Sequence, residues 1–271
     1  MILIQFFNER MLYRISVSDY SSNFILKGAL LFLAHDISRF RPTKDIDFLG
    51  NDISNEIEDI KEIFLEIANI KYEDGVKFDS KSKSVERINE PNEYNGVRLK
   101  IDAKLDSTRQ RIQIDIGFGD VVFPEPVQID FPVILDLEPP KILAYSLETS
   151  ISEKFEAIVS LGLSNSRMKD FYDIYYLASS QKFNSSDLTI SIKETFKRRK
   201  TKLEDRRYVF TDSFVNDQEK QIMWKAFLNR NQIKIEYTFS DILEKIKEFI
   251  EPIIFQESPL NWDPSKWEWL K

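Results

Sequence analysis

The segment Lys44-Asp45-Ile46-Asp47-Phe48-Leu49 decides the fold of the first half of the chain, because its polar and apolar residues alternate. In an extended strand, residues two apart point to the same side. Asp45 and Asp47 therefore project together, while Ile46 and Phe48 turn toward a core. We expect a strand over residues 45–49 that presents two carboxylates on one face.

Two further elements flank this strand. Phe24 to Leu26 predicts a short strand that turns at Gly28 into an apolar helix, where a glycine would let backbone amides approach a phosphate. From Ser54 onward, apolar residues recur at three- and four-residue intervals, which is typical of a helix packed on a sheet. That stripe consists of Ile57, Ile60, Phe64 and Ile67.

A third carboxylate follows in the next extended region. Gly96 to Leu105 and Arg109 to Gly117 alternate on either side of Asp106-Ser107-Thr108, which predicts an antiparallel hairpin. Isoleucines line one side of the second strand, and Gln113 and Asp115 lie on the other. Asp115 is therefore able to converge with the earlier pair.

Everything after about Pro140 reads as helices. We predict a helix opened by a capping box at Ser150-Ile151-Ser152-Glu153 and closed by Gly162. Further helices are expected from about Ser166 to Ala178, from about Asp187, and over Phe239 to Ile250, with Trp262, Trp267 and Trp269 packing the tail onto the body. The fold class is therefore α+β, with an α+β domain over residues 1–140 and a mainly helical domain over residues 141–271.

The composition limits the classes of function. The 271 residues include no cysteine and only one histidine, His35, which excludes thiolate chemistry and sites built from several imidazoles. A net charge of -7 argues against broad binding of nucleic acid, so any such contact must be local. No apolar run reaches the roughly 20 residues of a membrane span. We expect a cytoplasmic protein with no membrane partner.

Grouped carboxylates favour a divalent metal. Like charges on a rigid sheet repel one another unless a cation neutralises them, and oxygen ligands suit Mg²⁺ or Mn²⁺. Such a site serves in-line displacement at phosphorus, as in phosphoryl or nucleotidyl transfer. A bare Asp-x-Asp is common by chance and usually faces solvent, so its weight comes from the neighbouring Lys27-Gly28 turn and from Asp115.

Five runs of sequence carry a resemblance to a known family. They are Leu26-Lys27-Gly28-Ala29-Leu30-Leu31, Arg41-Pro42-Thr43-Lys44-Asp45-Ile46-Asp47-Phe48, Gln113-Ile114-Asp115-Ile116, Glu153-Lys154-Phe155-Glu156-Ala157 and Ser166-Arg167-Met168-Lys169-Asp170-Phe171-Tyr172-Asp173. Together they span most of the chain, which resembles the AbiEii family of nucleotidyltransferase-like toxins.

The resemblance implies a fold, an activity and partners. The expected fold is a nucleotidyltransferase core of the polymerase-beta type, with a mixed sheet, followed by a helical domain. The implied role is that of a toxin paired with an AbiEi-like antitoxin in abortive infection or growth arrest. The implied reaction uses Mg²⁺ or Mn²⁺ and moves a nucleotide from an NTP to an RNA, most plausibly the 3′ end of tRNA.

Site residues follow from the same resemblance. Asp45, Asp47 and Asp115 would bind metal, and Lys154 with Asp170 or Asp173 would be the residues of the second signature needed for activity. The nucleotide would be bound by Lys27, Gly28, Ala29, Lys44, Lys154, Arg167 and Lys169. Ala29 departs from the glycine or serine that is usual in the broader superfamily, so a serine hydroxyl for the phosphates is missing.

Several of these residues have a plainer interpretation. Lys154 lies at the edge of an apolar helical stripe, where a lysine usually extends to water. Arg167 with Asp170, and Lys169 with Asp173, have the spacing of ion pairs on a solvated helix face. The run from Lys193 to Arg207 is the strongest local positive charge, and Lys197, Arg198, Arg199 and Lys200 within it are candidates for RNA contact or for a solvated helix end.

Other functions share part of this pattern. The acceptor of the nucleotide could be a protein or a small molecule. A glycosyltransferase also uses Asp-x-Asp to hold a metal, although it does not ordinarily require Asp115 or the Lys27-Gly28 turn. A non-catalytic nucleotide-binding module, motivated by Ala29, is the alternative outside enzymes.

Overall fold

The computed structural model describes residues 2–35, 43–88, 96–256 and 258–271. These residues divide into two compact units. The first comprises Met1–Asp120 and Pro126–Tyr145, and the second comprises Val121–Glu125 and Ser146–Lys271. Within the described ranges, no helix is both long and apolar enough to cross a membrane.

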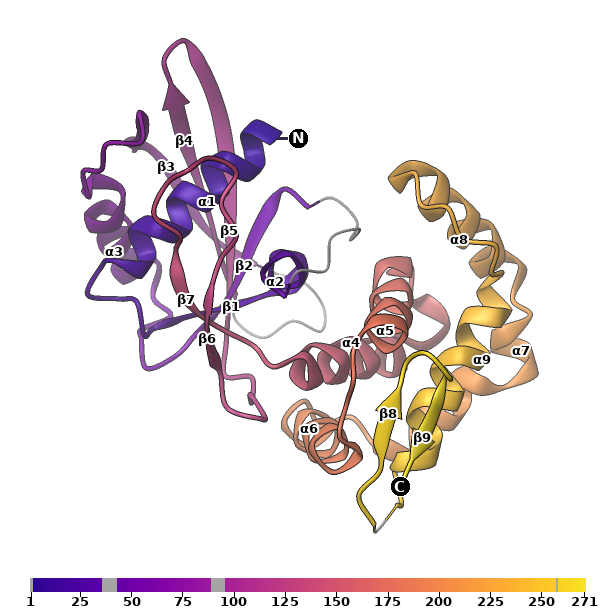
Figure 1. Cartoon of the computed structure of the whole chain (residues 1–271). Helices are drawn as coiled ribbons and strands as arrows, with labels where there is room; N and C mark the ends of the chain where they lie inside the picture. The colour runs from indigo at the N-terminus through magenta and orange to yellow at the C-terminus, as the bar shows by residue number, and fades with distance from the viewer. Residues whose placement is uncertain (1, 36–42, 89–95, 257) are drawn as a thin grey trace. The chain divides into compact units, whose positions relative to one another are not determined.

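The first unit is built on a seven-stranded mixed sheet (Figure 1). Its order is β3-β4-β5-β2-β1-β7-β6, in which β1 pairs parallel with β7, β2 pairs parallel with β5, and the other neighbours are antiparallel. The elements in chain order are α1 (Ile2–Ser16), β1 (Phe24–Lys27), α2 (Gly28–Ala34), β2 (Asp45–Gly50), α3 (Ile57–Asn69), β3 (Val76–Ile88), β4 (Gly96–Leu105), β5 (Thr108–Phe118), β6 (Val127–Asp130) and β7 (Lys141–Ala144).

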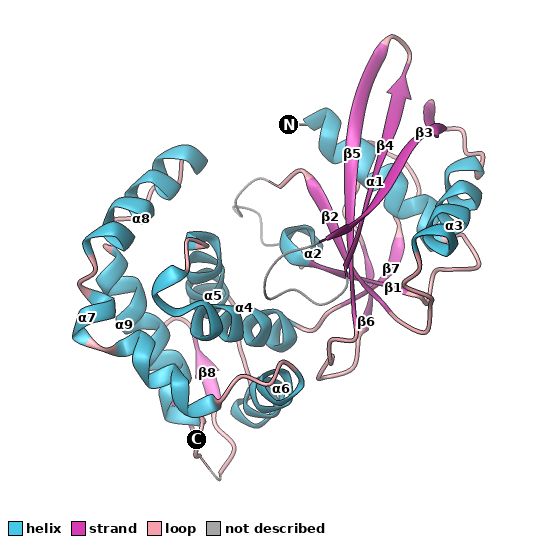
Figure 2. Ribbon diagram, turned by 180° about the vertical axis from the view of Figure 1, so that it is seen from behind, coloured by secondary structure: helices cyan, strands magenta, loops and turns pink. Residues whose placement is uncertain are grey.

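The second unit is mainly helical (Figure 2). Its elements are α4 (Leu147–Leu161), the 3-10 turn η1 (Gly162–Ser164), α5 (Met168–Ser180), α6 (Ser185–Arg198), η2 (Leu203–Phe210), α7 (Asp212–Val215), α8 (Gln218–Asn231), α9 (Phe239–Ile250), η3 (Glu251–Ile253), and the short hairpin β8 (Asn261–Asp263) and β9 (Glu268–Leu270). The predicted α+β class, a mixed sheet followed by a mainly helical half, is confirmed.

One face of the sheet is a packed core. Ile46 and Phe48 on β2 are fully buried, and the rings of Phe48 and Phe64 both contact the ring of Phe24, which joins β1 and β2 to α3. Helix α1 contacts β5 and β7 alongside α3. Since side chains alternate along a strand, this packing turns Asp45 and Asp47 to the opposite, polar face.

Three expectations about secondary structure were wrong. The helix expected from Ser54 begins at Ile57, because the Ser54 hydroxyl instead accepts a hydrogen bond from the amide of Glu56. The capping box at Ser150 lies inside α4, whose true N-cap is Ser146, where the hydroxyl accepts from the amide of Thr149. The chain after Pro140 is not wholly helical, since β7 completes the sheet through its pairing with β1 and β6.

The tail packs as predicted. Trp262 is 2% exposed and donates its indole N–H to the carbonyl of Ala178 at 2.6 Å. Trp269 donates to the carbonyl of Phe249 at 2.8 Å, and the two rings stack. These contacts fix β8 and β9 against the helices of the second unit.

Candidate active site

The two aspartates of β2 lie on its polar face. Both are partly exposed, whereas Ile46 between them is fully buried. The predicted strand and its alternation are therefore confirmed, and the two carboxylates project to the same side. Arg41 and Pro42, quoted from the same run of sequence, lie outside the described residues.

Strand β5 brings a third carboxylate beside this pair. It runs parallel to β2, with Asp47 opposite Asp115 and Asp45 opposite Gln113. Neighbouring strands lie roughly 4.8 Å apart, so side chains at paired positions on one face are close neighbours. The sheet thus places Asp115 next to Asp47, as its alternation with the isoleucines predicts.

Arg98 on β4 holds Asp115 in a fixed orientation. Its Nε donates to Oδ1 and its Nη2 donates to Oδ2, both at 2.8 Å, and Gln113 donates to Oδ2 at 3.1 Å. Hydrogen bonding to Asp115 is the main cause that raises the pKa of Arg98, and the negative charges of Asp115 and Asp45 raise it further against the opposing effect of burial. Arg98 therefore stays charged and neutralises part of the negative charge on this face.

Arg98 was not among the residues that the sequence suggested. The expected turn was Asp106-Ser107-Thr108, which would place Arg98 opposite Ile116. The turn is one residue shorter, because Leu105 pairs with Thr108 and Arg98 pairs with Asp115. Asp106 adopts φ 51° in the two-residue turn Asp106-Ser107, and aspartate is one of the residue types that tolerate this conformation. Asp106 is therefore the sequence signal that could have revealed the pairing of Arg98 with Asp115.

Gly28 fits against Asp47. Its φ is +68°, and a Cβ built there would lie 2.1 Å from Oδ2 of Asp47. Only glycine tolerates both the backbone conformation and the approach of the carboxylate. The junction of β1 and α2 is therefore shaped around Asp47.

The other residues near this junction take different positions. Lys27 forms an ion pair with Asp120 at 3.1 Å, and its ammonium lies 5.4 Å from the centroid of the Tyr145 ring. The side chain of Ala29 is only 4% exposed and belongs to the core. Lys44 is exposed, and its carbonyl accepts a hydrogen bond from Asn8 of α1 at 3.0 Å, which anchors the entry to β2.

A pocket of about 470 Å³ lies at the far ends of β2 and β5. It is lined by residues 49–56 and 118–120, so it includes Asp120 but none of the three aspartates on the polar face. We place the candidate chemistry at the aspartates of β2 and β5, because the strand register brings their carboxylates to neighbouring positions on one face.

The donor set at β2 fits a divalent cation. Asp45 and Asp47 offer carboxylate oxygens on one face, and Mg²⁺ commonly takes one or two carboxylates together with substrate phosphates. Across the described residues, no three acidic or histidine side chains group closely enough to hold a metal. Asp45 and Asp47 are the carboxylates of β2 that could hold the cation, and Arg98 engages the neighbouring Asp115.

A second cluster lies within the helical unit. Lys154 of α4 contacts Asp173 at 2.7 Å and Asp170 at 3.4 Å, and both aspartates belong to α5. The side chains are 13% exposed for Lys154, 1% for Asp170 and 0% for Asp173. Lys154 is thus a partly buried, paired lysine rather than one that extends to water, and both candidate aspartates contact it.

Charges around Asp170 keep it ionised. Burial raises the pKa of Asp170, but the charges of Lys154, Arg167 and Lys169, in that order, outweigh burial and hold the pKa below its usual value. Arg167 donates from Nε to Asp170 at 2.8 Å, so the spacing of three residues does form an ion pair. The second signature is therefore one connected group of charges.

The basic run at the C-terminal end of α6 is only partly available for RNA. Arg199 contacts Glu153 at 3.3 Å and Glu156 at 3.1 Å, and its side chain is 17% exposed. Lys197 is 78% exposed and faces Glu194 at 3.7 Å. Arg199 thus stabilises the helical unit, whereas Lys197 lies at its surface.

One comparison with known proteins identifies a family. A sequence model described as the nucleotidyl transferase AbiEii toxin of type IV toxin–antitoxin systems matches residues 10–245. Among curated proteins, none matches the chain significantly.

Two solved structures from Helicobacter pylori are similar to this chain. The protein JHP933 has a TM-score of 0.46 and 15% identity, with 92% of this chain and 94% of that one covered. A structure described as a candidate nucleotidyltransferase has a TM-score of 0.46 and 16% identity, with 92% and 97% covered.

Proposed function

The chain belongs to the AbiEii family of nucleotidyl transferase toxins of type IV toxin–antitoxin systems, and we propose that it transfers a nucleoside monophosphate from an NTP to the 3′ hydroxyl of an RNA. We take tRNA as the favoured acceptor and the cytoplasm, where NTPs and tRNA are abundant, as the place of reaction. The observation that carries the proposal is the register of β2 and β5, which sets Asp47 beside Asp115 on the face that also presents Asp45.

The proposed reaction is an in-line displacement at the α-phosphorus of the NTP. The oxygen of the acceptor hydroxyl forms a new bond to this phosphorus, the bond to the bridging oxygen of the β-phosphate breaks, and pyrophosphate leaves with that oxygen. When bound, Mg²⁺ or Mn²⁺ would offset the charge of the phosphates and of the departing pyrophosphate. Asp45 and Asp47 would hold it.

Asp115 is proposed to act on the acceptor. A carboxylate accepts the hydroxyl proton as the new bond forms, and its efficiency depends on correct placement. The bidentate contact with Arg98 supports this role, because it fixes the plane of the Asp115 carboxylate. Asp115 lies opposite Asp47 in the sheet, so it would also be available as a third ligand of the cation.

Residues of the second signature are proposed to be required as well. A lysine whose ammonium is fixed by two carboxylates can act as a positioned point charge for a polyphosphate. The contacts of Lys154 with Asp170 and Asp173, and of Arg167 with Asp170, support a role for the whole group and not for one aspartate alone. Lys27, Lys44, Lys169 and the exposed Lys197 remain proposed contacts for nucleotide or RNA.

Membership of a toxin–antitoxin family implies an antitoxin. We propose an AbiEi-like protein in this role. A gene for such a protein beside the gene for this chain would support the proposal.

The function is tested by incubating the protein with total tRNA, Mg²⁺ and each α-labelled NTP in turn. The expected result is label at the 3′ end of RNA, with free pyrophosphate in equal amount, and neither product when EDTA is present. Label in a protein band or in a small soluble product would move the acceptor to another class. No label in any fraction, with any NTP, would contradict the proposal.

The matched variants for this assay are Asp47→Asn in the proposed site and Asp59→Asn on the exposed surface of α3. Both substitutions remove one negative charge and keep the size of the side chain. Label should be lost in the first and retained in the second.

A further inference from the structure

We propose that the polar face of the hairpin β4–β5 is the surface along which the phosphate backbone of the RNA acceptor binds. Its cations, which we call the cationic track, are Arg98, Lys100, Lys104, Arg109 and Arg111. The inference rests on the proposed function, since it names where the acceptor of that reaction lies.

The strand register places the track on the same face as the aspartates. Arg98 pairs with Asp115, Lys100 with Gln113, and Lys104 with Arg109. Gln113 in turn pairs with Asp45 of β2. The row of side chains therefore begins beside Asp45 and Asp47 and continues toward the turn at Asp106, with side chains two residues apart on one face of a strand separated by roughly 6.7 Å.

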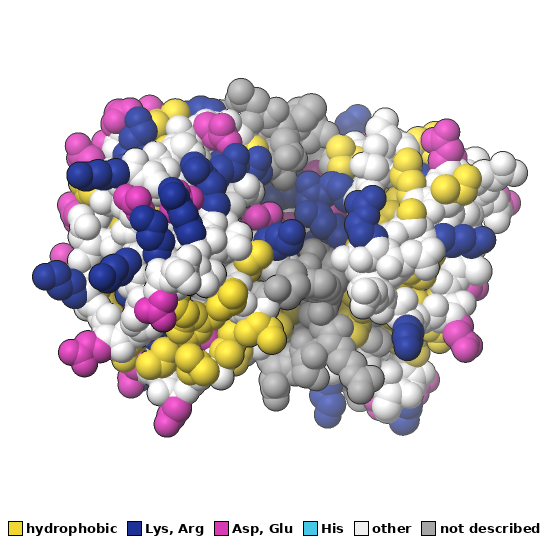
Figure 3. All heavy atoms as spheres, turned by 90° about the horizontal axis from the view of Figure 1, so that it is seen from above, with side chains coloured by type: hydrophobic (Ala, Val, Ile, Leu, Met, Phe, Trp, Pro, Cys, Tyr) yellow, Lys and Arg dark blue, Asp and Glu magenta, His cyan; other side chains and the backbone are white. Residues whose placement is uncertain are grey.

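The charge of this region is opposite to that of the whole chain. The described parts of β3, β4 and β5 with the β4–β5 turn, residues 76–88 and 96–118, contain nine Lys and Arg against five Asp and Glu. The whole chain has a net charge of -7. Residues 89–95 include Glu90 and Glu93 and lie outside the described residues. Figure 3, which looks onto the hairpin end of the sheet, shows Lys and Arg gathered there in dark blue.

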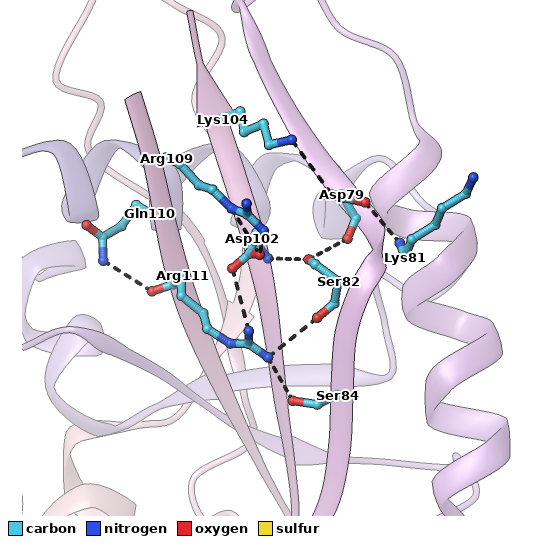
Figure 4. Close-up of polar contacts among 9 residues, drawn as sticks. All are labelled: Asp79, Lys81, Ser82, Ser84, Asp102, Lys104, Arg109, Gln110 and Arg111. Atoms are coloured by element: carbon cyan, nitrogen blue, oxygen red, sulfur yellow. Dashed lines mark hydrogen bonds and ion pairs between the residues drawn. The ribbon is translucent and has the colours of Figure 1, made fainter. Parts of the chain in front are cut away.

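Arg109 and Arg111 of the track are held in place by a single shared carboxylate. Arg109 and Arg111 both contact Asp102, so one carboxylate serves two guanidinium groups (Figure 4). Arg111 also donates to the Ser84 hydroxyl at 3.0 Å. Their side chains are 57% and 48% exposed, whereas that of Asp102 is 7% exposed. A buried carboxylate thus orients two exposed cations toward solvent.

The lysines of the track have weaker partners. Lys104 faces Asp79 at 3.8 Å and Lys100 faces Glu86 at 3.1 Å. The side chains of Lys104 and Lys100 are 46% and 35% exposed. Exposed pairs of this kind contribute about 0–1 kcal/mol, so a phosphate can readily replace the carboxylate.

The chemistry of the face favours a polyanion. From Arg98 to Arg111, the side chains that the two strands present on this face are charged or polar, so they offer neither an apolar patch nor a ring on which a base would stack. Lys and Arg neutralise phosphates independently of sequence. The aspartates at one end repel phosphates, so the backbone would remain on the track while the terminal hydroxyl reaches Asp115.

The test measures RNA binding separately from transfer. The full chain is mixed with 5′-labelled total tRNA in EDTA, and the dissociation constant is measured by filter binding at several KCl concentrations. The track variant carries three substitutions, Lys100→Gln, Lys104→Gln and Arg111→Gln, which leave Arg109 to pair with Asp102. The control variant removes the same charge elsewhere in the unit, by Lys61→Gln, Lys71→Gln and Lys141→Gln.

We expect the track variant to bind at least tenfold more weakly than the control variant. Each phosphate contact on a single strand contributes roughly 0.7 to the slope of log affinity against log salt, so three lost contacts should lower that slope by about two. Thermal melts of both variants establish that each is folded. A weaker, less salt-dependent track variant supports the surface even if no nucleotide is ever transferred.

Equal affinity and equal slope in the two variants would overturn the proposal. If transfer to tRNA then proceeds with an unchanged KM in the track variant, the proposed function stands and only the surface is wrong. If the track variant keeps its RNA affinity but loses binding of polyglutamate, the face serves an acidic protein, which also overturns the proposal.

Discussion

Asp115 of β5 and Asp170 of α5 both contact an arginine at 2.8 Å, but water reaches them to different extents. The side chain of Asp115 is 17% exposed beside an Arg98 that is 29% exposed, whereas Asp170 is 1% exposed and Asp173 is fully buried. We therefore expect the sheet cluster of Asp45, Asp47, Asp115 and Arg98 to be able to exchange its internal ion pair for a ligand. The helical cluster of Lys154, Arg167, Asp170 and Asp173 fixes Lys154 within the second unit. We expect that unit to lose stability if any member of the cluster is removed.

The largest expected effect is on the sheet cluster. Asp47→Asn keeps the shape of the side chain but removes a charged ligand, and we expect transfer to fall by about 100- to 1000-fold, the range seen when one preorganised electrostatic group is lost. The free energy of unfolding should change little, because Asp47 is partly exposed. Initial transfer rates and urea unfolding are measured for this variant. A loss of stability without a loss of transfer would contradict the distinction between the sheet cluster and the helical cluster.

The second effect is on the helical cluster. Lys154→Met leaves two buried carboxylates without their shared cation, and breaking a buried pair costs about 3–5 kcal/mol of unfolding free energy. Lys61→Met is the matched control, because its pair with Glu58 is exposed and contributes less than about 1 kcal/mol. Urea unfolding measures both variants.

A double variant sharpens this result. Lys154→Met with Asp173→Asn removes one charge of each sign and should recover part of the lost stability. If transfer remains lost in the stable double variant, the cluster has a role beyond folding. Full activity in that variant would show that Lys154 is purely structural.

The third effect separates backbone strain from the fit around Asp47. Gly28→Ala and Gly162→Ala both place a Cβ at positive φ, and a sparsely populated backbone conformation of this kind costs a non-glycine residue roughly 1–3 kcal/mol. Only at position 28 does the new atom meet Asp47, since nothing lies within 4 Å of the Cβ at position 162. Both variants should lose stability, but only Gly28→Ala should lose transfer, by about tenfold or more. Equal activity in the two variants would show that the position of Asp47 does not matter.

The smallest effect concerns Arg98. Arg98→Gln removes a cation beside Asp115 and Asp45, so the site should bind Mn²⁺ several-fold more tightly, because like charges repel. The transfer rate should fall by about tenfold, since Asp115 loses its bidentate partner. Arg87→Gln on β3, whose partner Glu56 is exposed, is the control and should change neither. Mn²⁺ affinity that is unchanged in Arg98→Gln would mean that Asp115 and Arg98 lie outside the metal site.

The sequence predicted those elements whose side chains alternate cleanly. Strands β1 and β2, the hairpin β4–β5 and helix α9 were all recognised. Strand β3 was missed, because its register shifts between Asp79 and Ser84 and a run of serine and lysine replaces the alternation. Helix α1 was missed because its buried side includes Asn8, Glu9, Arg10 and Arg14, which hide the apolar stripe.

The same limit explains what was missed in the site. Asp45, Asp47 and Asp115 could be proposed from alternation, which is a local property. The pairing of Arg98 with Asp115 could not be predicted without the register of the β4–β5 turn. The contacts of Lys154 with Asp170 and Asp173 could not be predicted without the packing of α4 on α5. In both cases an isolated charged residue resembles a solvated one until its partner across the fold is known.

The central claim is that Asp45 and Asp47 bind a divalent cation. The most direct measurement is electron paramagnetic resonance of Mn²⁺ titrated with the wild-type chain and with the folded Asp45→Asn/Asp47→Asn variant. We expect Mn²⁺ to bind to the wild type, more tightly when an NTP is present, and this binding to be lost in the variant. Equal binding of Mn²⁺ by both proteins would contradict the central claim.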